Sequence, residues 1–223
     1  MKTELPDILP KIKGPIALAF SYQAEDVAAL QLLLQHSPAS LELEIFTLDT
    51  LKLFPETYTY HETVERFFSV SIKTYYPLPA ELRQLEEKLG EWGMRGSLED
   101  RRYCCHVRKV APLKQALAGK SAWVTGLRAV QSLTRRNLPV LEYDPEHQLL
   151  KLNPLVSWSD EDLADYLEKQ GLPLHPLYAQ GFKSIGCAPC TRAVKEGEDI
   201  RSGRWWWENP EHKECGLHLK KHR

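Results

Sequence analysis

The chain has 223 residues, enough for one sizeable domain that buries most of its unfolded surface and needs no disulfide or metal merely to fold. Its hydrophobic fraction of 43% and charged fraction of 26% are ordinary, and the formal net charge of −1 argues against a general nucleic-acid binder. No apolar run is long enough for a membrane span, and residues 1–13 lack a signal-peptide core. We therefore expect a cytoplasmic protein with no nucleic-acid or membrane partner.

Short apolar runs alternate with amphipathic stretches in the first half of the chain. We expect strands at residues 16–20, 43–48, 72–76 and 123–125. We expect helices at residues 26–35, 56–68, 80–89, 108–118 and 159–170. Ser159 is the expected N-cap of the last helix, with Asp162 three residues on in a variant of the capping box. Strands alternating with helices predict an α/β fold, with a Rossmann-like parallel sheet covered by helices on both faces.

The character of the chain changes after Gly171. Residues 172–223 show little periodicity but many prolines, glycines, tryptophans, cysteines and basic residues. We expect residues 1–171 to form the α/β core and residues 172–223 to form an irregular functional segment of the same domain.

Five cysteines are present, and their spacing is unusual for a disulfide framework, which normally has an even number. They are a tandem pair, a C-x-x-C pair and a single residue: Cys104, Cys105, Cys187, Cys190 and Cys215. This pattern suggests four ligands and one free thiol. Four thiolates suit a [4Fe–4S] cluster. A structural zinc site with four cysteine ligands is the alternative, although a tandem pair is awkward for tetrahedral zinc.

Polar side chains follow three of the expected strands, at the sheet edge where open α/β folds bind their ligands. They lie in Ser21–Asp26, in Leu48-Asp49-Thr50 and in Thr125-Gly126-Leu127-Arg128. Their hydroxyl, amide and carboxylate groups suit a polar, partly anionic ligand, although most such turns look similar.

The stretch Ser21–Asp26 is similar to a loop that holds pyrophosphate in ATP-pyrophosphatase enzymes, but it lacks paired glycines. Those glycines let backbone N–H groups approach the phosphates. Their absence argues against ATP hydrolysis and favours a ligand with a single phosphate. A purely structural role, in which Ser21 and Asp26 cap the next helix, is equally compatible with the residues.

Several segments, in the same order along the chain, resemble the assimilatory sulfonucleotide reductases. They are Cys104-Cys105-His106-Val107-Arg108-Lys109, Lys151-Leu152-Asn153-Pro154-Leu155, Ser184 to Ala193, Gly197-Glu198-Asp199, Gly203 to Glu208 and Lys213 to His218. The resemblance runs from about Ala17 to His218. It is closer to the adenylyl-sulfate (APS) reductase branch, which carries the four-cysteine motif that relatives using 3′-phosphoadenylyl sulfate (PAPS) mostly lack.

The resemblance implies a fold of the adenine nucleotide alpha-hydrolase, or PP-loop, type. It also implies that Cys104, Cys105, Cys187 and Cys190 hold a [4Fe–4S] cluster. Residues 1–171 would bind the nucleotide, and residues 172–223 would complete the cluster and carry the nucleophile.

By the same resemblance, Cys215 attacks the sulfur of the phosphosulfate, AMP leaves, and reduced thioredoxin releases sulfite from the S-sulfocysteine. Lys213 and His218 flank Cys215, and nearby cations favour the reactive thiolate. A lone cysteine can otherwise be a buried small hydrophobe or an exposed accident. The chain would then serve sulfate assimilation and cysteine biosynthesis.

The basic residues that match substrate-contacting positions are Lys109, Arg201 and Arg204, with His218 in the nucleophile motif. Positioned cations stabilise the charge that develops as the P–O–S bridge breaks, whereas most surface Lys and Arg only solvate a face. Arg128 is a candidate nucleotide contact, and Ser21, Asp49 and Gly126 are candidates in the binding loops.

The chain departs from the family at two places. The family usually has Gly-Arg where this chain has Leu51-Lys52, and it often has a second Arg at Ala129. Lys52 keeps a charge but loses the geometry of a guanidinium. These departures put details of nucleotide contact in doubt.

The three tryptophans Trp205–Trp207 could stack on adenine or dock thioredoxin, but packing that anchors the last segment is the favoured interpretation. We expect residues near Cys215 to be mobile, so that one thiol can meet both the nucleotide and thioredoxin.

Three other functions stay open. The same chemistry on PAPS needs an extra basic pocket for the 3′-phosphate. ATP-dependent thiolation or amidation is disfavoured by the missing glycine pair. A redox- or iron-sensing module would use the cluster as its output. The sequence also leaves open whether the chain forms a homo-oligomer.

Overall fold

The computed structural model describes residues 3–131, 137–199 and 202–209. The chain divides into two compact units, each built from several segments. Unit 1 comprises Met1–Thr47, Thr59–Lys73 and Leu117–His175, and unit 2 comprises Leu48–Tyr58, Thr74–Ala116 and Pro176–Arg223. The expected division near residue 171 stays a prediction.

Unit 1 is organised by a six-stranded sheet of order β3-β2-β1-β4-β6-β5. The strands are β1 (Ile16–Ala19), β2 (Leu43–Leu48), β3 (Ile72–Tyr75), β4 (Ala122–Val124), β5 (Leu141–Asp144) and β6 (Leu149–Leu152). The last residue of β2 and the last two of β3 fall in unit 2. Strand β1 pairs in parallel with both β2 and β4, and β4 pairs in parallel with β6. The expected α/β fold is confirmed, and the four predicted strands lie within a residue or two of their predicted positions.

The sheet is mostly parallel, as expected, and it has one antiparallel edge. Strand β5 runs antiparallel to β6, and sequence analysis predicted neither strand. The turn between them is closed by Asp144, whose Oδ1 accepts bonds from the backbone N–H groups of Glu146 and His147 at 3.0 and 3.3 Å. The sequence from residue 141 to 152 is therefore a tight hairpin at the sheet edge.

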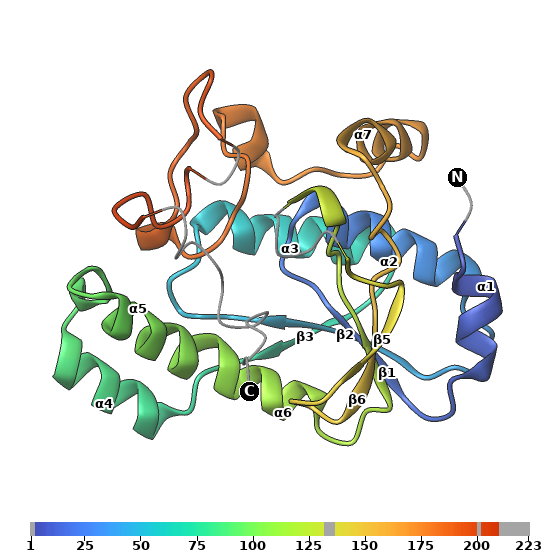
Figure 1. Cartoon of the computed structure of the whole chain (residues 1–223), viewed down its shortest axis with the longest axis horizontal. Helices are drawn as coiled ribbons and strands as arrows, with labels where there is room; N and C mark the ends of the chain where they lie inside the picture. Colours follow the sequence, from blue (N-terminus) through green and yellow to red (C-terminus); the bar gives the residue numbers. More distant parts are fainter. Residues whose placement is uncertain (1–2, 132–136, 200–201, 210–223) are drawn as a thin grey trace. The chain divides into compact units, whose positions relative to one another are not determined.

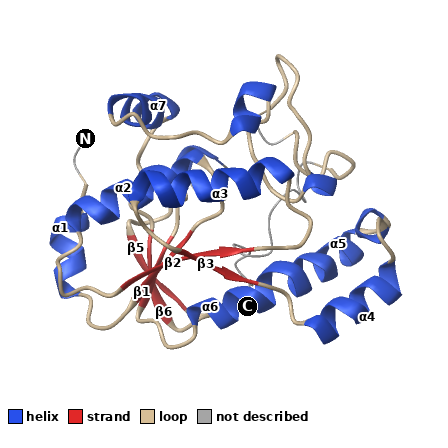
Figure 2. Ribbon diagram, turned by 180° about the vertical axis from the view of Figure 1, so that it is seen from behind, coloured by secondary structure: helices blue, strands red, loops and turns tan. Residues whose placement is uncertain are grey.

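Helix α2 (Ala24–His36) lies along one face of the sheet, and α7 (Asp160–Lys169) packs against α2 on the side away from the strands (Figures 1 and 2). Leu30 and Leu33 of α2 and Ile16 and Leu18 of β1 are fully buried, because the apolar strand and helix cover each other. The capping box at the start of α7 is confirmed. Ser159 Oγ accepts from the Asp162 N–H, and the Asp162 carboxylate accepts from the Ser159 N–H, both at 3.0 Å.

The remaining helices include α1 (Leu5–Ile8), α3 (Pro55–Phe68), α4 (Pro79–Leu89), α5 (Leu98–Cys105) and α6 (Ala111–Leu117). In unit 2, α4 and α5 lie side by side (Figure 1). Helix α5 was missed by sequence analysis. Ser97 begins it as N-cap and accepts a bond from the Asp100 N–H at 3.0 Å.

The helix predicted at 108–118 is in fact the end of a longer helical stretch that starts in α5. Residues His106–Val110 form a π-helical turn between α5 and α6. Pro112 has no N–H to donate to the carbonyl of Arg108, which is a local reason for the altered winding. This turn follows directly after Cys104 and Cys105, and π-turns are frequent at functional sites.

After residue 171 the described chain holds only short turns of 3₁₀ helix, at Pro176–Gln180 and Ala188–Cys190, and one isolated bridge between Thr191 and Arg204. The irregular character expected here is confirmed for the part of the chain that the structure describes. No helix among the described residues has the length and apolar character of a membrane span.

Candidate functional site

The candidate residues fall into both units. Ser21, Gly126 and Arg128 belong to unit 1, whereas Asp49, Lys109, Arg204 and the four paired cysteines belong to unit 2. Cys215, His218 and Arg201 lie outside the described residues, and so does the predicted mobility near Cys215. The roles of these three residues stay predictions.

In unit 1, the turn after β1 is closed by the buried carboxylate of Asp26. Its Oδ2 accepts bonds from the Ser21 N–H at 2.7 Å, the Ser21 hydroxyl at 2.6 Å and the Gln23 N–H at 3.4 Å. Burial raises the pKa of Asp26 to about 7, although the bonds from Ser21 pull the pKa the other way. The described contacts of Ser21 and Asp26 therefore order the start of α2. This agrees with the helix-capping role that the sequence left open for these two residues.

Tyr22 occupies the left-handed region in the same turn, with φ of 65°. A tyrosine rarely adopts this conformation, and here its hydroxyl lies 2.7 Å from Nδ1 of His61. That contact and its edge-on packing against Phe20 hold the turn in its strained shape. Sequence analysis did not single out Tyr22 or His61.

Gly126 follows β4 and lies against the first turn of α2. A Cβ at this position would stand 2.6 Å from Oδ1 of Asp26 and 2.8 Å from the Cβ of Glu25. A glycine is therefore needed for close packing between the end of β4 and α2. Its role in nucleotide binding stays a prediction.

Arg128 is buried in an ion-pair network of unit 1. Its Nη2 lies 2.9 Å from Oε1 of Glu25 and 2.7 Å from Oδ1 of Asp160, and its Nε also donates to Glu25. The structure thus pairs this guanidinium with the buried carboxylate of Glu25 and the exposed carboxylate of Asp160. Nucleotide contact by Arg128 stays a prediction.

In unit 2, Asp49 organises the turn after β2. Its Oδ1 accepts from the Leu51 N–H at 2.7 Å and from the Tyr58 hydroxyl at 3.1 Å. Burial, together with the charge of Asp49, raises the pKa of Tyr58 to about 12. Leu51 has φ of 57°, in the region that favours glycine, which gives a physical reason for the glycine that the family usually has here.

Three of the four paired cysteines gather in one packed cluster of unit 2. Cys190 is buried with Met94 and Trp205, and Cys104 and Cys187 pack against them. Cys105 instead lies beside Arg101, which precedes it by one helical turn of α5. This separation of neighbours follows from the helix, in which adjacent side chains point about 100° apart. We call these four residues the cysteine set.

The surroundings of the cysteine set shift the pKa values of Cys187 and Cys190 in opposite directions. Burial raises the pKa of the Cys187 thiol, but Lys109, a hydrogen bond with Thr50 and Arg204 outweigh it, so that the pKa lies below its ordinary value. Burial and the charge of Cys187 raise the pKa of Cys190 to about 12. Cys187 is therefore the thiol of this pair that is easier to deprotonate.

Three basic residues of unit 2 lie close enough to the cysteine set to influence its thiols by their charge. The half-buried Lys109 and the buried Arg108 come from the π-helical turn, and the buried Arg204 is the residue that forms the isolated bridge with Thr191. Arg108 donates to the Thr50 carbonyl at 2.7 Å and to Glu86 at 2.9 Å. Arg108 was missed as a candidate, although it precedes Lys109 in the motif.

Three buried N–H groups next to the cysteine set lack a hydrogen-bond partner among the described residues: Nε of Arg108, Nε of Arg204 and Nε1 of Trp205. Buried donors are normally satisfied, so three such groups near the cysteine set call for an acceptor. An anionic group rich in sulfur would accept from such donors. The donor set thus fits a cluster in its chemistry.

The residue types suit a cluster, but the described side chains are not arranged as metal ligands. Among the described residues, no three His, Cys, Asp or Glu side chains converge as a metal-ligand group. The packing of Cys104, Cys187 and Cys190 brings the thiols to one place without metal-ligand geometry.

Trp205 is buried, and two guanidinium groups lie over its ring, those of Arg101 and Arg204, each 4.6 Å from the ring centroid. Arg95 lies over the rings of Trp92, Trp206 and Trp207 at 4.8 to 4.9 Å, and donates to the Pro189 carbonyl at 2.8 Å. The tryptophan run therefore packs onto unit 2 residues around the C-x-x-C segment, which is the favoured interpretation from sequence.

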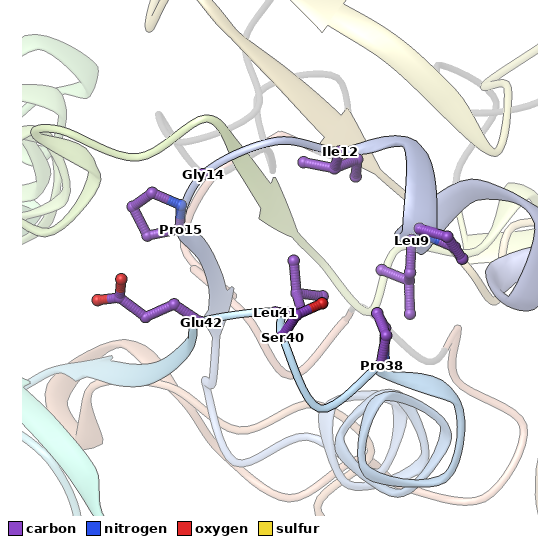
Figure 3. A pocket seen from close by; sticks show the side chains of 9 residues that line it. Leu9, Ile12, Gly14, Pro15, Pro38, Ser40, Leu41 and Glu42 are labelled. Atoms are coloured by element: carbon purple, nitrogen blue, oxygen red, sulfur yellow. The ribbon is translucent and has the colours of Figure 1, made fainter.

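Unit 1 holds a pocket of about 160 Å³ whose lining includes none of the candidate site residues (Figure 3). It is lined by Leu9, Ile12, Pro15, Leu41 and Glu42, among others. Pro15 and Glu42 directly precede β1 and β2, so the pocket opens at the amino ends of these strands. Open α/β sheets bind their ligands at the carboxyl ends, and we do not assign this pocket to the site.

The chain matches known proteins in both sequence and fold. It is 48% identical over 205 residues to adenosine 5′-phosphosulfate reductase of Allochromatium vinosum, covering 92% of this chain and 79% of that protein. It is 45% identical to adenosine 5′-phosphosulfate reductase of Neisseria meningitidis, covering 90% of this chain and 81% of that protein.

A crystal structure of phosphoadenylyl-sulfate (PAPS) reductase from Candida auris, a phosphate complex, superposes with a TM-score of 0.69 at 24% identity. The match covers 85% of this chain and 88% of that one, and it supports the fold. Residues 15–193 match the model of the phosphoadenosine phosphosulfate reductase domain. On this match and the identity to its relatives, the chain belongs to the phosphoadenosine phosphosulfate reductase domain family.

Proposed function

We propose that this chain is an oxidoreductase that reduces adenosine 5′-phosphosulfate to sulfite and AMP. The observation that carries this function is the identity of 45 to 48%, over most of both chains, to proteins named adenosine 5′-phosphosulfate reductase. The identity to the PAPS reductase of Candida auris is lower, at 24%. APS is therefore the proposed substrate, and the reaction belongs to sulfate assimilation.

The proposed first step is nucleophilic attack by the Cys215 thiolate on the sulfur of the phosphosulfate. A bond forms between the cysteine Sγ and this sulfur, and the bond from the sulfur to the bridging oxygen breaks. The electron pair leaves with AMP, and an S-sulfocysteine remains on the enzyme.

The second step needs two electrons from outside, because the proposal commits the other four thiols to a cluster. We propose a dithiol donor of the thioredoxin type. One of its thiolates attacks Cys215 Sγ, sulfite leaves with the electron pair, and the second donor thiol resolves the mixed disulfide. The donor ends as a disulfide, and Cys215 returns as a thiol. A thioredoxin kept reduced suits a cytoplasmic location.

The basic residues supply charge during the first step. We propose that Lys109, Arg201 and Arg204 contact the phosphosulfate, that His218 assists at Cys215, and that Arg128 contacts the nucleotide. Ser21, Asp49 and Gly126 would shape the loops that bind it. The charges of Lys109 and Arg204 act to lower the pKa values of Cys187 and Cys190, which supports a site centred in that part of unit 2.

A [4Fe–4S] cluster on Cys104, Cys105, Cys187 and Cys190 is part of the proposal. Four thiols, nearby cations and three unpartnered N–H donors support it. When bound, the cluster would supply a fixed charged group beside the substrate. The segments that carry the four cysteines would hold Lys109 and the turn after β2 in place.

The experiment that tests this function traps the intermediate. Anaerobically purified protein is mixed with APS in the absence of any thiol, and the peptide that contains Cys215 is weighed by mass spectrometry. We expect one SO₃ group on Cys215 and release of AMP in equal amount. An unmodified Cys215 after AMP has been released would contradict the proposed nucleophile.

A further inference from the structure

The loop between β1 and α2 contains a backbone conformation that favours glycine, but the residue there is a tyrosine. Tyr22 has φ of 65°, a value at which the Cβ of an L-residue crowds the following carbonyl oxygen. A strained conformation of this kind persists only where neighbouring groups hold it. The side chain of Tyr22 is 5% exposed, so such groups surround it.

His61 of α3 holds the polar end of the Tyr22 side chain. The tyrosine hydroxyl and Nδ1 of His61 share a hydrogen bond of 2.7 Å. The other ring nitrogen, Nε2, lies 3.5 Å from Oε1 of Glu65. That carboxylate oxygen also accepts a bond from the N–H of Ile72, the first residue of β3, at 2.7 Å. His61 is therefore oriented by the loop on one side and by a fixed carboxylate on the other.

Aromatic rings pack against the apolar part of the Tyr22 side chain. Phe20 meets the Tyr22 ring edge-on at 5.3 Å between centroids, and Tyr60 lies at 6.3 Å. Tyr60 comes from the same helix as His61, but its hydroxyl donates to the Pro173 carbonyl at 2.8 Å. Tyr60 is thus a neighbour of the same chemistry whose hydroxyl bonds outside the loop.

Asp26 fixes the loop on either side of Tyr22. Its Oδ2 accepts from the N–H and the hydroxyl of Ser21 and from the N–H of Gln23. Loops that bind phosphate commonly use glycine for positive φ, since their backbone N–H groups must approach an anion closely. This chain reaches such a conformation at Tyr22 with a side-chain hydrogen bond instead. We call this bond the Tyr22–His61 brace.

We propose that Tyr22 and His61 are positioning residues for substrate binding, because their hydrogen bond holds the loop after β1 in the shape that receives the nucleotide. The inference rests on the proposed function, in which this loop helps to bind APS. It adds that α3 supplies, through the brace, a loop shape for which the sequence lacks the glycines. Without the brace the loop relaxes for part of the time, and the apparent affinity falls with the fraction of competent loop.

The test compares three substitutions at position 22. Tyr22→Phe keeps the ring and loses the hydroxyl. Tyr22→Ala and Tyr22→Gly both remove the ring and its packing, but only glycine adopts positive φ without strain. The matched control is Tyr60→Phe, which removes a buried hydroxyl from the same aromatic group without touching the brace.

We expect Tyr22→Phe and Tyr22→Ala to raise the KM for APS, and the dissociation constant of AMP measured by calorimetry, about tenfold. The kcat should stay near wild type, because bound substrate restores the loop shape. Tyr22→Gly should return both constants most of the way to wild type, although it packs worst. Tyr60→Phe should lower the melting temperature and leave the KM unchanged. Equal KM values for Tyr22→Ala and Tyr22→Gly would overturn the positioning role, because lost packing alone would then explain them.

A double-mutant cycle tests the brace without any substrate. Tyr22→Phe and His61→Ala should each lower the melting temperature, and the double variant should lower it no further than His61→Ala, because both changes remove one hydrogen bond. His61→Asn, whose amide can take the place of Nδ1, should recover part of the loss. Additive losses would overturn the brace.

The two readouts separate this inference from the proposed function. If wild-type protein binds AMP but fails to act on APS, the proposed reaction is wrong, and the AMP affinities and the cycle still decide whether the brace shapes a nucleotide-binding loop. If wild-type protein binds neither AMP nor APS, the inference itself is overturned.

Discussion

Cys187 and Thr50 are joined by a hydrogen bond across 137 residues of sequence, in which the Cys187 Sγ donates to the Thr50 Oγ1 at 3.2 Å. The neighbouring Ala188 N–H donates to the Lys52 carbonyl at 2.7 Å. The turn after β2, where a parallel sheet offers its ligand edge, is thus attached directly to the C-x-x-C segment. Changes at the cysteines are therefore expected to reach this turn.

The first prediction concerns Thr50→Val. The Thr50 hydroxyl lowers the pKa of Cys187, because it can donate to the sulfur once the thiol has lost its proton, so removal of the hydroxyl should raise that pKa. The pH dependence of Cys187 alkylation in metal-free protein measures this, and Thr50→Ser, which keeps the hydroxyl, is the control. Identical pH profiles for Val and wild type would contradict it.

The second prediction concerns Gly186, which lies against the Arg204 guanidinium. A Cβ at position 186 would stand 2.4 Å from Nη2 of Arg204. Because that group ends a flexible side chain, Gly186→Ala should cost only about 1 kcal/mol of stability while displacing Arg204 from Trp205. We expect sulfite release to fall more than tenfold, by the loss of one positioned cation. Wild-type kcat/KM would show that Arg204 has no role in turnover.

The third prediction concerns Arg128→Ala. Removal of the guanidinium leaves Glu25 buried without its partner, which should lower the free energy of unfolding by about 3–5 kcal/mol. Replacing the pair together, as Arg128→Met with Glu25→Leu, should restore much of that loss. Urea denaturation measures both. Full stability of Arg128→Ala with a raised KM would instead favour the role in nucleotide contact.

The fourth prediction concerns the buried carboxyl of Asp26, whose pKa is raised from 3.8 to about 7 by burial. The folded state therefore binds a proton that the unfolded state has lost between these values, and its stability falls as pH rises from about 4 to 7. The slope should be roughly 1.4 kcal/mol per pH unit where the difference is complete. Asp26→Asn should remove this contribution, as chemical denaturation at several pH values would show. Parallel stability curves for the two proteins would contradict it.

The sequence predicts the strands well where burial dominates. Residues 43–48 match β2 throughout, because this short segment is rich in apolar and β-branched residues, which favour a strand. The β5–β6 hairpin escaped prediction, because β5 is short, half exposed and depends on bonds from Asp144 rather than on periodicity. Helix α5 escaped for a similar reason, since its polar sequence has no apolar stripe and the burial of Arg101 depends on distant residues such as Glu208 and Trp205.

Some residues of the candidate site could likewise be predicted from the sequence, and others only from the fold. The sequence motif identifies the cysteines, and packing then brings together Cys104, Cys187 and Cys190, which are up to 86 positions apart in the chain. The internal pairing of Arg128 with Glu25 could not be seen in sequence, because a buried and an exposed arginine look alike before the fold is known. Arg108 and Glu208 were likewise hidden, since each acts through a partner distant in sequence.

The most direct test of the central claim is sulfite release by anaerobically purified protein with reduced thioredoxin, with APS and PAPS as alternative substrates and Cys215→Ser as the matched variant. We predict a strong preference for APS, and a Cys215→Ser protein that keeps its brown colour but releases no sulfite. Preference for PAPS would contradict the proposed substrate, loss of colour in Cys215→Ser would contradict the ligand assignment, and sulfite release by that variant would contradict the nucleophile.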